Sequence, residues 1–213
     1  VVFPWFGARD GQPIHGCARL ADWDLLETAV LPDGSVSLHF RLPGGDGCQV
    51  DHTVVVGGDL TMELAVTNTG AAEFTFESCL HSYFRVGDIH RVRIVGLQGA
   101  RYRDQLLAAD FSEAADAIRF TAETDRVYQE TAAAVEIIDP ALGRAIQIRK
   151  SGSMSTVVWN PWIEKSRRMP DFGDDEYPQM VCVESGNVRE HAVTLPPGGR
   201  ASLVVTLGCA PLA

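Results

Sequence analysis

The stretch Ser78–Phe84 carries a histidine in a place where it could exchange a proton with a ligand. It ends a run from Phe74 onward that alternates like a half-buried β-strand. Because strand side chains alternate between two faces, His81 is predicted to lie opposite the phenylalanines, just before the aromatic pair Tyr83 and Phe84. Such a histidine could donate a proton beside a ring-shaped ligand, or it could be a structural histidine that satisfies a loop carbonyl.

A second candidate is the strand-like stretch Val181–Val188, which carries a glutamate among apolar residues. Alternation places Cys182 and Glu184 on one face and Val181 and Val183 on the other. A carboxylate on the non-core face of an apolar strand is a candidate general base. The alternative is an ordinary glutamate that faces solvent.

Three further stretches offer groups for a sugar or an anion. Asp125 could accept hydrogen bonds from sugar hydroxyls, or it could form only a local ion pair with Arg126. Arg19 could present its guanidinium fork to a phosphate. Trp159 and Trp162, in the stretch VVWNPW, could form an aromatic wall at a loop mouth or a plug in the core.

Motifs for a metal or a cofactor do not stand out. The acidic cluster Asp174–Glu176 lacks the alternating ligands and closing glutamate of a calcium loop, so a solvated run of charge is the better interpretation. The chain has no Gly-rich phosphate loop and no GxSxG nucleophile motif. We therefore expect neither a metal nor a cofactor.

The elements that would position these residues are many short strands. Turn signals at Pro32-Asp33-Gly34 and Gly57-Gly58-Asp59 separate alternating apolar runs. Residues 105–117 alone have a possible helical character, with weak periodicity, and 160–177 reads as a long irregular loop. Evenly spaced short strands with Gly- and Pro-rich turns predict an all-β fold, an antiparallel sandwich or barrel, in one domain over residues 1–213.

The composition narrows the class of protein. The 213 residues are 46% hydrophobic and 22% charged, which is typical of a soluble globular protein, and no segment approaches the roughly 20 consecutive apolar residues that span a bilayer. The net charge of −10 argues against a nucleic-acid partner, since phosphates require a basic patch. An odd number of scattered cysteines without CxxC predicts reduced thiols, and hence a cytoplasmic protein. We also expect a monomer.

Taken together, the motifs resemble one family. The ordered series is FPWFG, PIHGCAR, LHSYF, GLQG, ETDRVY, VVWNPW, MPDFGDDEY and MVCVESGNV. It resembles the hexose-6-phosphate mutarotases, also called glucose-6-phosphate 1-epimerases, within the wider aldose 1-epimerase group. The resemblance covers nearly the whole chain, with the motifs in family order.

The resemblance implies a fold, a reaction and a set of site residues. The fold would be the large antiparallel β-sandwich of the galactose-mutarotase type. The reaction would interconvert the α and β anomers of a hexose 6-phosphate, with glucose 6-phosphate as the expected small-molecule partner. His81 and Glu184 would be catalytic, and Asp125 and Arg19 would contact the substrate.

Two departures from the family pattern concern the substrate site. Ile14 stands where some members have a substrate-contacting glutamine before the HG pair. Another family arginine, in an Arg-Gly-Gly stretch, would precede the point at which this chain begins, as would several N-terminal strands. We therefore expect an N-terminally truncated version of the sandwich.

Three alternative functions remain open from the sequence. The nearest is an aldose 1-epimerase that acts on free hexoses. A second is a non-catalytic β-sandwich that binds sugar phosphates. A third is a glycosidase, for which Asp125 and Glu184 would have to form a suitably spaced carboxylate pair.

Overall fold

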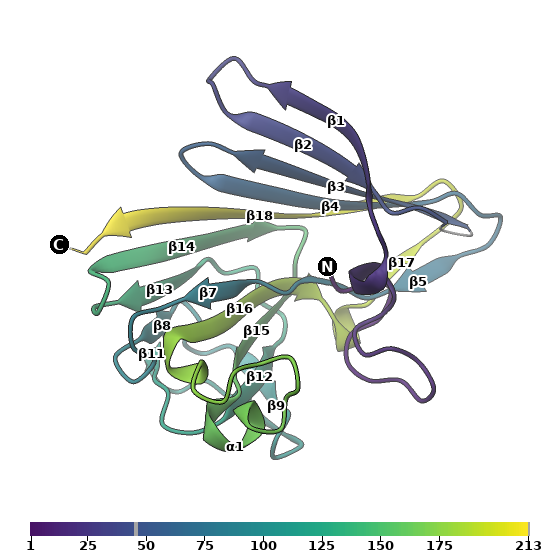
Figure 1. Cartoon of the computed structure of the whole chain (residues 1–213). Coiled ribbons are helices and arrows are strands. Elements are labelled where there is room, and N and C mark those ends of the chain that lie inside the picture. The colour runs from purple at the N-terminus through teal and green to yellow at the C-terminus, as the bar shows by residue number, and fades with distance from the viewer. Residues whose placement is uncertain (45–46, 213) are drawn as a thin grey trace. The chain divides into compact units, whose positions relative to one another are not determined.

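The chain folds into two compact units in the computed structural model, which describes residues 1–44 and 47–212 (Figure 1). The first unit comprises Val1–Leu80, Lys150–Ser153 and Gly186–Gly208. The second comprises His81–Arg149, Met154–Ser185 and Cys209–Ala213. Each unit is assembled from three separate segments of the chain, and the single domain over residues 1–213 stays a prediction.

The first unit is built on an antiparallel sheet in which the first four strands are also consecutive in the sequence. The strand order is β1 (Asp24–Val30), β2 (Val36–Arg41), β3 (Cys48–Val56), β4 (Leu60–Asn68) and β18 (Arg200–Pro211). Gly57–Asp59 join β3 to β4 and Gly34 has φ +85° between β1 and β2, so both predicted turns are confirmed. A positive φ is a conformation that glycine adopts without steric cost.

The strand predicted to run from Phe74 to His81 is interrupted. Strand β5 (Phe74–Phe76) pairs with β17 (Val193–Leu195), and β6 (Ser78–Leu80) is a separate strand. Glu77 breaks the run because its backbone N–H donates to the Pro4 carbonyl and its carboxylate accepts a bond from the Phe6 N–H. The alternation that begins at Phe74 therefore ends before His81, so it cannot determine the face on which His81 lies.

The larger sheet of the second unit carries most of the candidate site. Its strand order is β10 (Ala109–Ser112), β9 (Arg101–Asp104), β12 (Thr124–Tyr128), β15 (Ser155–Asn160) and β16 (Met180–Asn187), and β7 (Tyr83–Arg85) also pairs with β16 (Figure 1). Every residue of β15 and β16 is buried. A strand that is covered on both faces needs apolar residues at nearly every position, which explains the sequences STVVWN and MVCV.

A second antiparallel sheet of this unit comprises β14 (Arg144–Ser151), β13 (Val135–Asp139), β8 (Arg93–Val95) and β11 (Ala117–Ile118). The helix considered for residues 105–117 is wrong, since this segment contains a turn, β10 and β11. Asp104 sets the turn because its Oδ1 accepts hydrogen bonds from the N–H groups of Leu106 and Leu107, both at 3.0 Å. The chain then returns as β10 alongside β9.

The stretch 160–177, expected to be an irregular loop, contains the short helix α1 (Trp162–Ser166). Asn160 explains where this helix begins. Its buried Oδ1 accepts a hydrogen bond from the Trp162 N–H at 2.9 Å, and its Nδ2 donates to the carbonyls of Tyr177 and Met180, each at 2.9 Å. One side chain thus fixes the start of α1 and the start of β16.

The antiparallel β class predicted from the sequence is confirmed within both units. All five cysteines are thiols, as their scattered spacing predicted. None of the helices in the described part of the chain has the length and apolar character that a membrane crossing requires.

Lys150, near the end of β14, gives a prediction about stability and pH. Burial lowers the pKa of Lys150 from 10.5 to about 8, against the opposing effect of Cys79. Between pH 8 and 10.5 the unfolded chain binds more protons at this lysine than the folded chain, so stability rises with pH in that window. Below pH 8 the protonated lysine costs free energy, and we expect Lys150→Met to stabilise the protein at pH 7 by about 1–3 kcal/mol.

Urea unfolding at pH 7, 8 and 10 tests this expectation. The rise in unfolding free energy of the wild type between pH 8 and 10 should be smaller in Lys150→Met. Lys150→Arg is the matched control, because it keeps a charge that does not titrate in this range. A Lys150→Met variant less stable than the wild type at pH 7 would contradict the prediction.

Candidate functional site

The pairing of β7 with β16 brings His81 opposite Glu184. Cys182 lies opposite Tyr83 and Val181 opposite Phe84 in this antiparallel ladder. Continuing the same register by two residues places His81 opposite Glu184, and on the face shared by Cys182 and Tyr83. The structure has the two side chains in contact, with 3.3 Å between His81 Nε2 and Glu184 Oε1.

Burial separates this pair from ordinary surface residues. Glu184 is 1% exposed, so the solvent-facing interpretation of this residue is wrong. The His81 side chain retains 22% of its exposure. Burying a carboxylate is expensive unless a partner compensates it, and His81 is such a partner. The pair therefore combines a shielded carboxylate with an imidazole that a ligand can reach.

Aromatic rings fix the orientation of His81. Its ring stacks on Tyr83 with centroids 4.9 Å apart and an interplanar angle of 12°. The Trp159 ring meets His81 edge-on at 6.4 Å and Tyr83 at 6.2 Å. Trp159 is 8% exposed and clusters with Met180 and Cys182, so of its two interpretations the core plug is correct. Tyr83 is the exposed aromatic of the site, at 58%.

Asp125 lies on β12, directly opposite Trp159 on β15. Its neighbour Arg126 points to the other face of the strand, where it pairs with Glu113 at 3.0 Å and with Asp104 at 4.0 Å. Both of these ion pairs of Arg126 lie away from Asp125, and the choice between the two interpretations of Asp125 stays a prediction. The period of two along a strand explains why neighbouring residues have separate partners.

Lys165 is a residue that the sequence did not single out. Its Nζ lies 3.9 Å from Asp125 Oδ2, 3.5 Å from Glu123 Oε1 and 5.8 Å from the centroid of the Trp159 ring. It belongs to α1, inside the stretch interpreted as an irregular loop. The signal that could have found it is Asn160-Pro161, because a polar residue and a proline commonly mark the start of a helix.

Cys182 lies between the candidate groups and is fully buried. Burial raises the pKa of its thiol well above the usual range, and the negative charges of Glu184 and Asp125 raise it further. A thiol with a raised pKa stays protonated at neutral pH and is a poor nucleophile. Asp125 and Glu184 belong to the same region of the unit, because Asp125 lies opposite Trp159, and the Trp159 ring contacts His81, the partner of Glu184.

His81, Cys182 and Glu184 could together hold a metal ion. One potential ligand atom from each lies within 4.8 Å of the other two. Nitrogen, sulfur and oxygen donors of this kind suit zinc, although binding would have to displace the thiol proton. The sequence pointed only to the acidic loop as a metal candidate, and the expectation that the protein needs no metal stays a prediction.

Arg19 belongs to the first unit, in the 3₁₀ helix Ala18–Leu20. It is exposed, and its guanidinium donates to the Ile14 carbonyl at 3.5 Å. Burial lowers the pKa of the nearby His15, and the charge of Arg19 lowers it further. The role of Arg19 in binding a phosphate stays a prediction.

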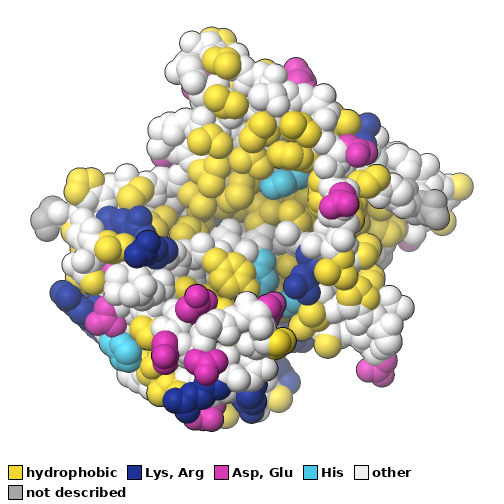
Figure 2. All heavy atoms as spheres, in the orientation of Figure 1, with side chains coloured by type: hydrophobic (Ala, Val, Ile, Leu, Met, Phe, Trp, Pro, Cys, Tyr) yellow, Lys and Arg dark blue, Asp and Glu magenta, His cyan; other side chains and the backbone are white. Residues whose placement is uncertain are grey.

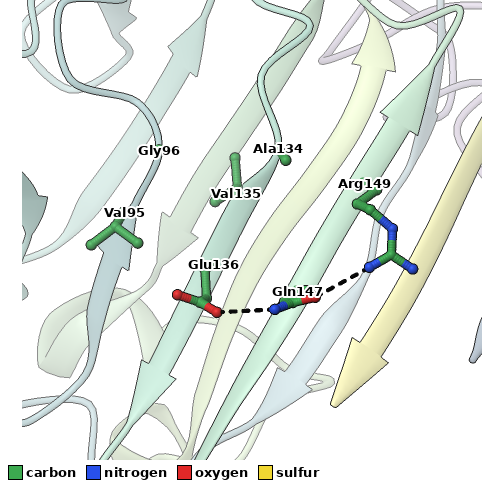
Figure 3. Close-up of a pocket in the computed structure, with 7 residues that line it drawn as sticks. All are labelled: Val95, Gly96, Ala134, Val135, Glu136, Gln147 and Arg149. Atoms are coloured by element: carbon green, nitrogen blue, oxygen red, sulfur yellow. Dashed lines mark hydrogen bonds between the residues drawn. The ribbon is translucent and has the colours of Figure 1, made fainter. Parts of the chain in front are cut away.

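A pocket of about 250 Å³ lies elsewhere in the second unit, over β8, β13 and β14 (Figure 3). Two hydrogen bonds cross its polar side, from Arg149 to Gln147 at 3.2 Å and from Gln147 to Glu136 at 3.5 Å. Its lining includes neither His81 nor Glu184. The acid–base candidates of the unit therefore lie outside this pocket.

The expectation that nucleic acid is not a partner stays a prediction, and the distribution of surface charge bears on it. On the face shown in Figure 2, basic and acidic side chains are interspersed rather than gathered into one basic patch. A nucleic-acid site needs such a patch to neutralise phosphates.

Comparison with known proteins identifies the family. A family model for aldose 1-epimerase matches residues 1–208. The chain belongs to the aldose 1-epimerase family. A Cenchrus ciliaris protein named "Putative glucose-6-phosphate 1-epimerase" is 40% identical over 93% of this chain and 65% of its own length. An Escherichia coli protein of the same name is 35% identical over 89% of this chain and 66% of its own length.

Solved structures show the same fold. A Salmonella typhimurium protein described as a "putative mutarotase" has a TM-score of 0.89 and 31% identity, over 99% of this chain and 72% of the other. A "galactose mutarotase-like protein" from Lactobacillus casei shares the fold with a TM-score of 0.71 at 15% identity. The predicted galactose-mutarotase type of fold is thus confirmed. The chain spans 65% to 66% of the length of the curated relatives that it matches.

Proposed function

We propose that this member of the aldose 1-epimerase family interconverts the α and β anomers of a hexose 6-phosphate, with glucose 6-phosphate as its substrate. The observation that supports the proposal is the contact between a buried carboxylate and a partly exposed imidazole, His81 Nε2 to Glu184 Oε1, at 3.3 Å. The names of the relatives at 35% and 40% identity supply the substrate class.

Ring opening requires two proton transfers at neighbouring oxygens. Glu184 takes the proton from the C1 hydroxyl as the C1–O5 bond breaks and the C1 carbonyl forms. Protonated His81 gives its Nε2 proton to the ring oxygen O5, which becomes the C5 hydroxyl. Both oxygens are bonded to C1, so an acid and a base that touch each other can reach both of them at once.

Ring closure reverses the two roles. After rotation about the C1–C2 bond, the C5 hydroxyl attacks the other face of the carbonyl and returns its proton to His81. Protonated Glu184 returns its proton to O1, and the opposite anomer forms. Both side chains end in their starting protonation states, so the cycle is closed. Proton transfer by positioned groups of this kind contributes about 10²–10⁴-fold each.

The surroundings of the pair suit these steps. Stacking on Tyr83 and edge contact with Trp159 hold the His81 ring in one plane. Burial of Glu184 keeps bulk water away from the carboxylate, which strengthens its interaction with a substrate proton. Asp125, on the neighbouring part of the sheet, is proposed to accept hydrogen bonds from sugar hydroxyls, and Arg19 to bind the phosphate.

Cellular context completes the proposal. Five thiols without a dithiol motif fit a reducing compartment, so we place the protein in the cytoplasm. It is proposed to act as a monomer, without a nucleic-acid or membrane partner and without a cofactor.

Exchange NMR on equilibrated glucose 6-phosphate tests the function and separates it from its alternatives. The protein should accelerate α–β exchange above the spontaneous rate, with a higher kcat/KM on glucose 6-phosphate than on glucose. Equal or better activity on glucose would favour an aldose 1-epimerase for free hexoses. Binding of glucose 6-phosphate without acceleration would make the protein a sugar-phosphate binder and overturn the proposal.

A further inference from the structure

Lys165 is a basic side chain whose contacts adjoin the candidate site of the second unit. Its Nζ is 3.5 Å from Glu123 Oε1 and 3.9 Å from Asp125 Oδ2, and it lies over Trp159, whose ring edge contacts His81. A lysine beside a sugar-phosphate site suggests a phosphate ligand at first sight. The charges around it argue for a different role.

The local charge balance is unfavourable for a phosphate. Glu123, Asp125 and Lys165 together carry a formal charge of −1, because two carboxylates share one ammonium. A phosphate monoester carries about −1.5 to −2 at pH 7. Bringing it to this cluster would place it next to two carboxylates that already compensate the charge of Lys165. Phosphate sites instead use cations in excess.

A neutral hydroxyl suits the same cluster well. A hydroxyl both donates and accepts, so it can donate to the Asp125 carboxylate and accept from the Lys165 ammonium. The three side chains remain partly exposed, at 23% for Glu123, 21% for Asp125 and 34% for Lys165, which leaves them accessible to a ligand. An ammonium also has three donors, so it can bind a hydroxyl while it stays beside its two carboxylates.

The cluster lies in the same region as the acid–base pair. Asp125 is directly opposite Trp159 on the neighbouring strand, Lys165 Nζ lies 5.8 Å from the centroid of the Trp159 ring, and the Trp159 and His81 rings are 6.4 Å apart. A sugar with its anomeric carbon at His81 and Glu184 would thus extend its other ring hydroxyls toward Asp125 and Lys165.

We propose that Lys165 and Asp125 form a hydroxyl-binding pair that recognises the sugar ring, and that Lys165 is not a ligand of the 6-phosphate. The inference rests on the proposed function and adds a substrate-binding residue and a basis for specificity. It places sugar recognition in the second unit and leaves phosphate recognition to other residues.

The test compares one variant on two substrates. Lys165→Met should lower kcat/KM for anomer exchange by about 10- to 100-fold, the range expected for the loss of a charge-assisted hydrogen bond. The loss should be the same, within about twofold, on glucose 6-phosphate and on glucose. Lys165→Arg should recover part of the activity, since it restores a cationic donor. Arg167→Met is the matched control, because this cation pairs with Glu164.

Deoxy sugars identify the hydroxyl that is bound. Wild type and Lys165→Met are compared on the 2-, 3- and 4-deoxy analogues of glucose 6-phosphate. On the analogue that lacks the bound hydroxyl, wild type and Lys165→Met should have the same kcat/KM, because the contact between Lys165 and that hydroxyl is already absent. A loss confined to glucose 6-phosphate would show that Lys165 binds phosphate and would overturn the inference. So would an unchanged rate on both substrates, or a full loss on every analogue.

Failure of the proposed function remains distinguishable from failure of this inference. If the wild type binds glucose 6-phosphate without accelerating exchange, the proposed reaction is wrong. The same variants and analogues are then compared by their dissociation constants in calorimetry. Equal weakening of glucose 6-phosphate and glucose by Lys165→Met supports the hydroxyl-binding pair, and weakening of glucose 6-phosphate alone overturns it.

Discussion

Replacing Glu184 by glutamine is expected to reduce kcat for anomer exchange by about 10²–10⁴-fold. Glutamine keeps the size and shape of the side chain but cannot take the proton from the C1 hydroxyl. The variant should remain folded, because glutamine keeps the buried volume and leaves a polar neighbour for His81, and an imidazole, unlike a guanidinium, has a neutral form that needs no counter-charge. His81→Asn should give a loss of similar size, since it removes the acid that protonates O5.

The double variant sharpens this expectation. Two groups that act on the same bond-breaking step form a unit, so Glu184→Gln with His81→Asn should cost little more than either change alone. Exchange NMR with glucose 6-phosphate measures all three rates, after subtraction of the spontaneous rate. Glu136→Gln, on the other sheet of the unit, is the control for loss of a glutamate charge. Single variants at the wild-type rate would show that these residues are not the acid and the base.

Local features of the fold were predictable from the sequence because short-range chemistry determines them. The Gly57–Asp59 connection between β3 and β4 lies between two alternating runs, where the turn residues and the period of two agree. The segment 105–117 was harder to assign. Its turn depends on Asp104, the residue just before the segment, whose Oδ1 accepts hydrogen bonds from two backbone N–H groups inside it.

The site was predictable only in part, and for a related reason. His81 and Glu184 were each candidates from the residues alone, and the resemblance implied that both are catalytic, while the alternation that was used to place His81 ends at Glu77, where the strand is interrupted. What joins His81 to Glu184 is the register between β7 and β16, whose residues are about 100 positions apart in the sequence. Lys165 was missed because it lies on the helix α1, about 40 residues along the chain from its partners Glu123 and Asp125, and no local sequence pattern predicts such a contact.

Glu113→Gln is expected to destabilise the protein by about 2–3 kcal/mol, the largest effect on stability that we predict. The Glu113 side chain is 8% exposed and accepts hydrogen bonds from the Tyr128 hydroxyl at 2.7 Å and from Arg126 at 3.0 Å. Burial raises the pKa of Tyr128, and its bond to Glu113 raises it further, so this hydroxyl stays a donor. Glutamine retains one acceptor oxygen but leaves the half-buried Arg126 without its closest carboxylate.

Urea unfolding of the wild type and Glu113→Gln measures this loss, and Glu164→Gln is the matched control. Glu164 also pairs with an arginine, Arg167, at 3.6 Å, but their side chains are 79% and 58% exposed. Water already screens that pair, so the control should change stability by less than about 0.5 kcal/mol. Equal small losses in both variants would mean that Glu113 does not hold β12. A larger loss at Glu113 would instead show that the strand carrying Asp125 is anchored from its opposite face, by residues that never touch the sugar.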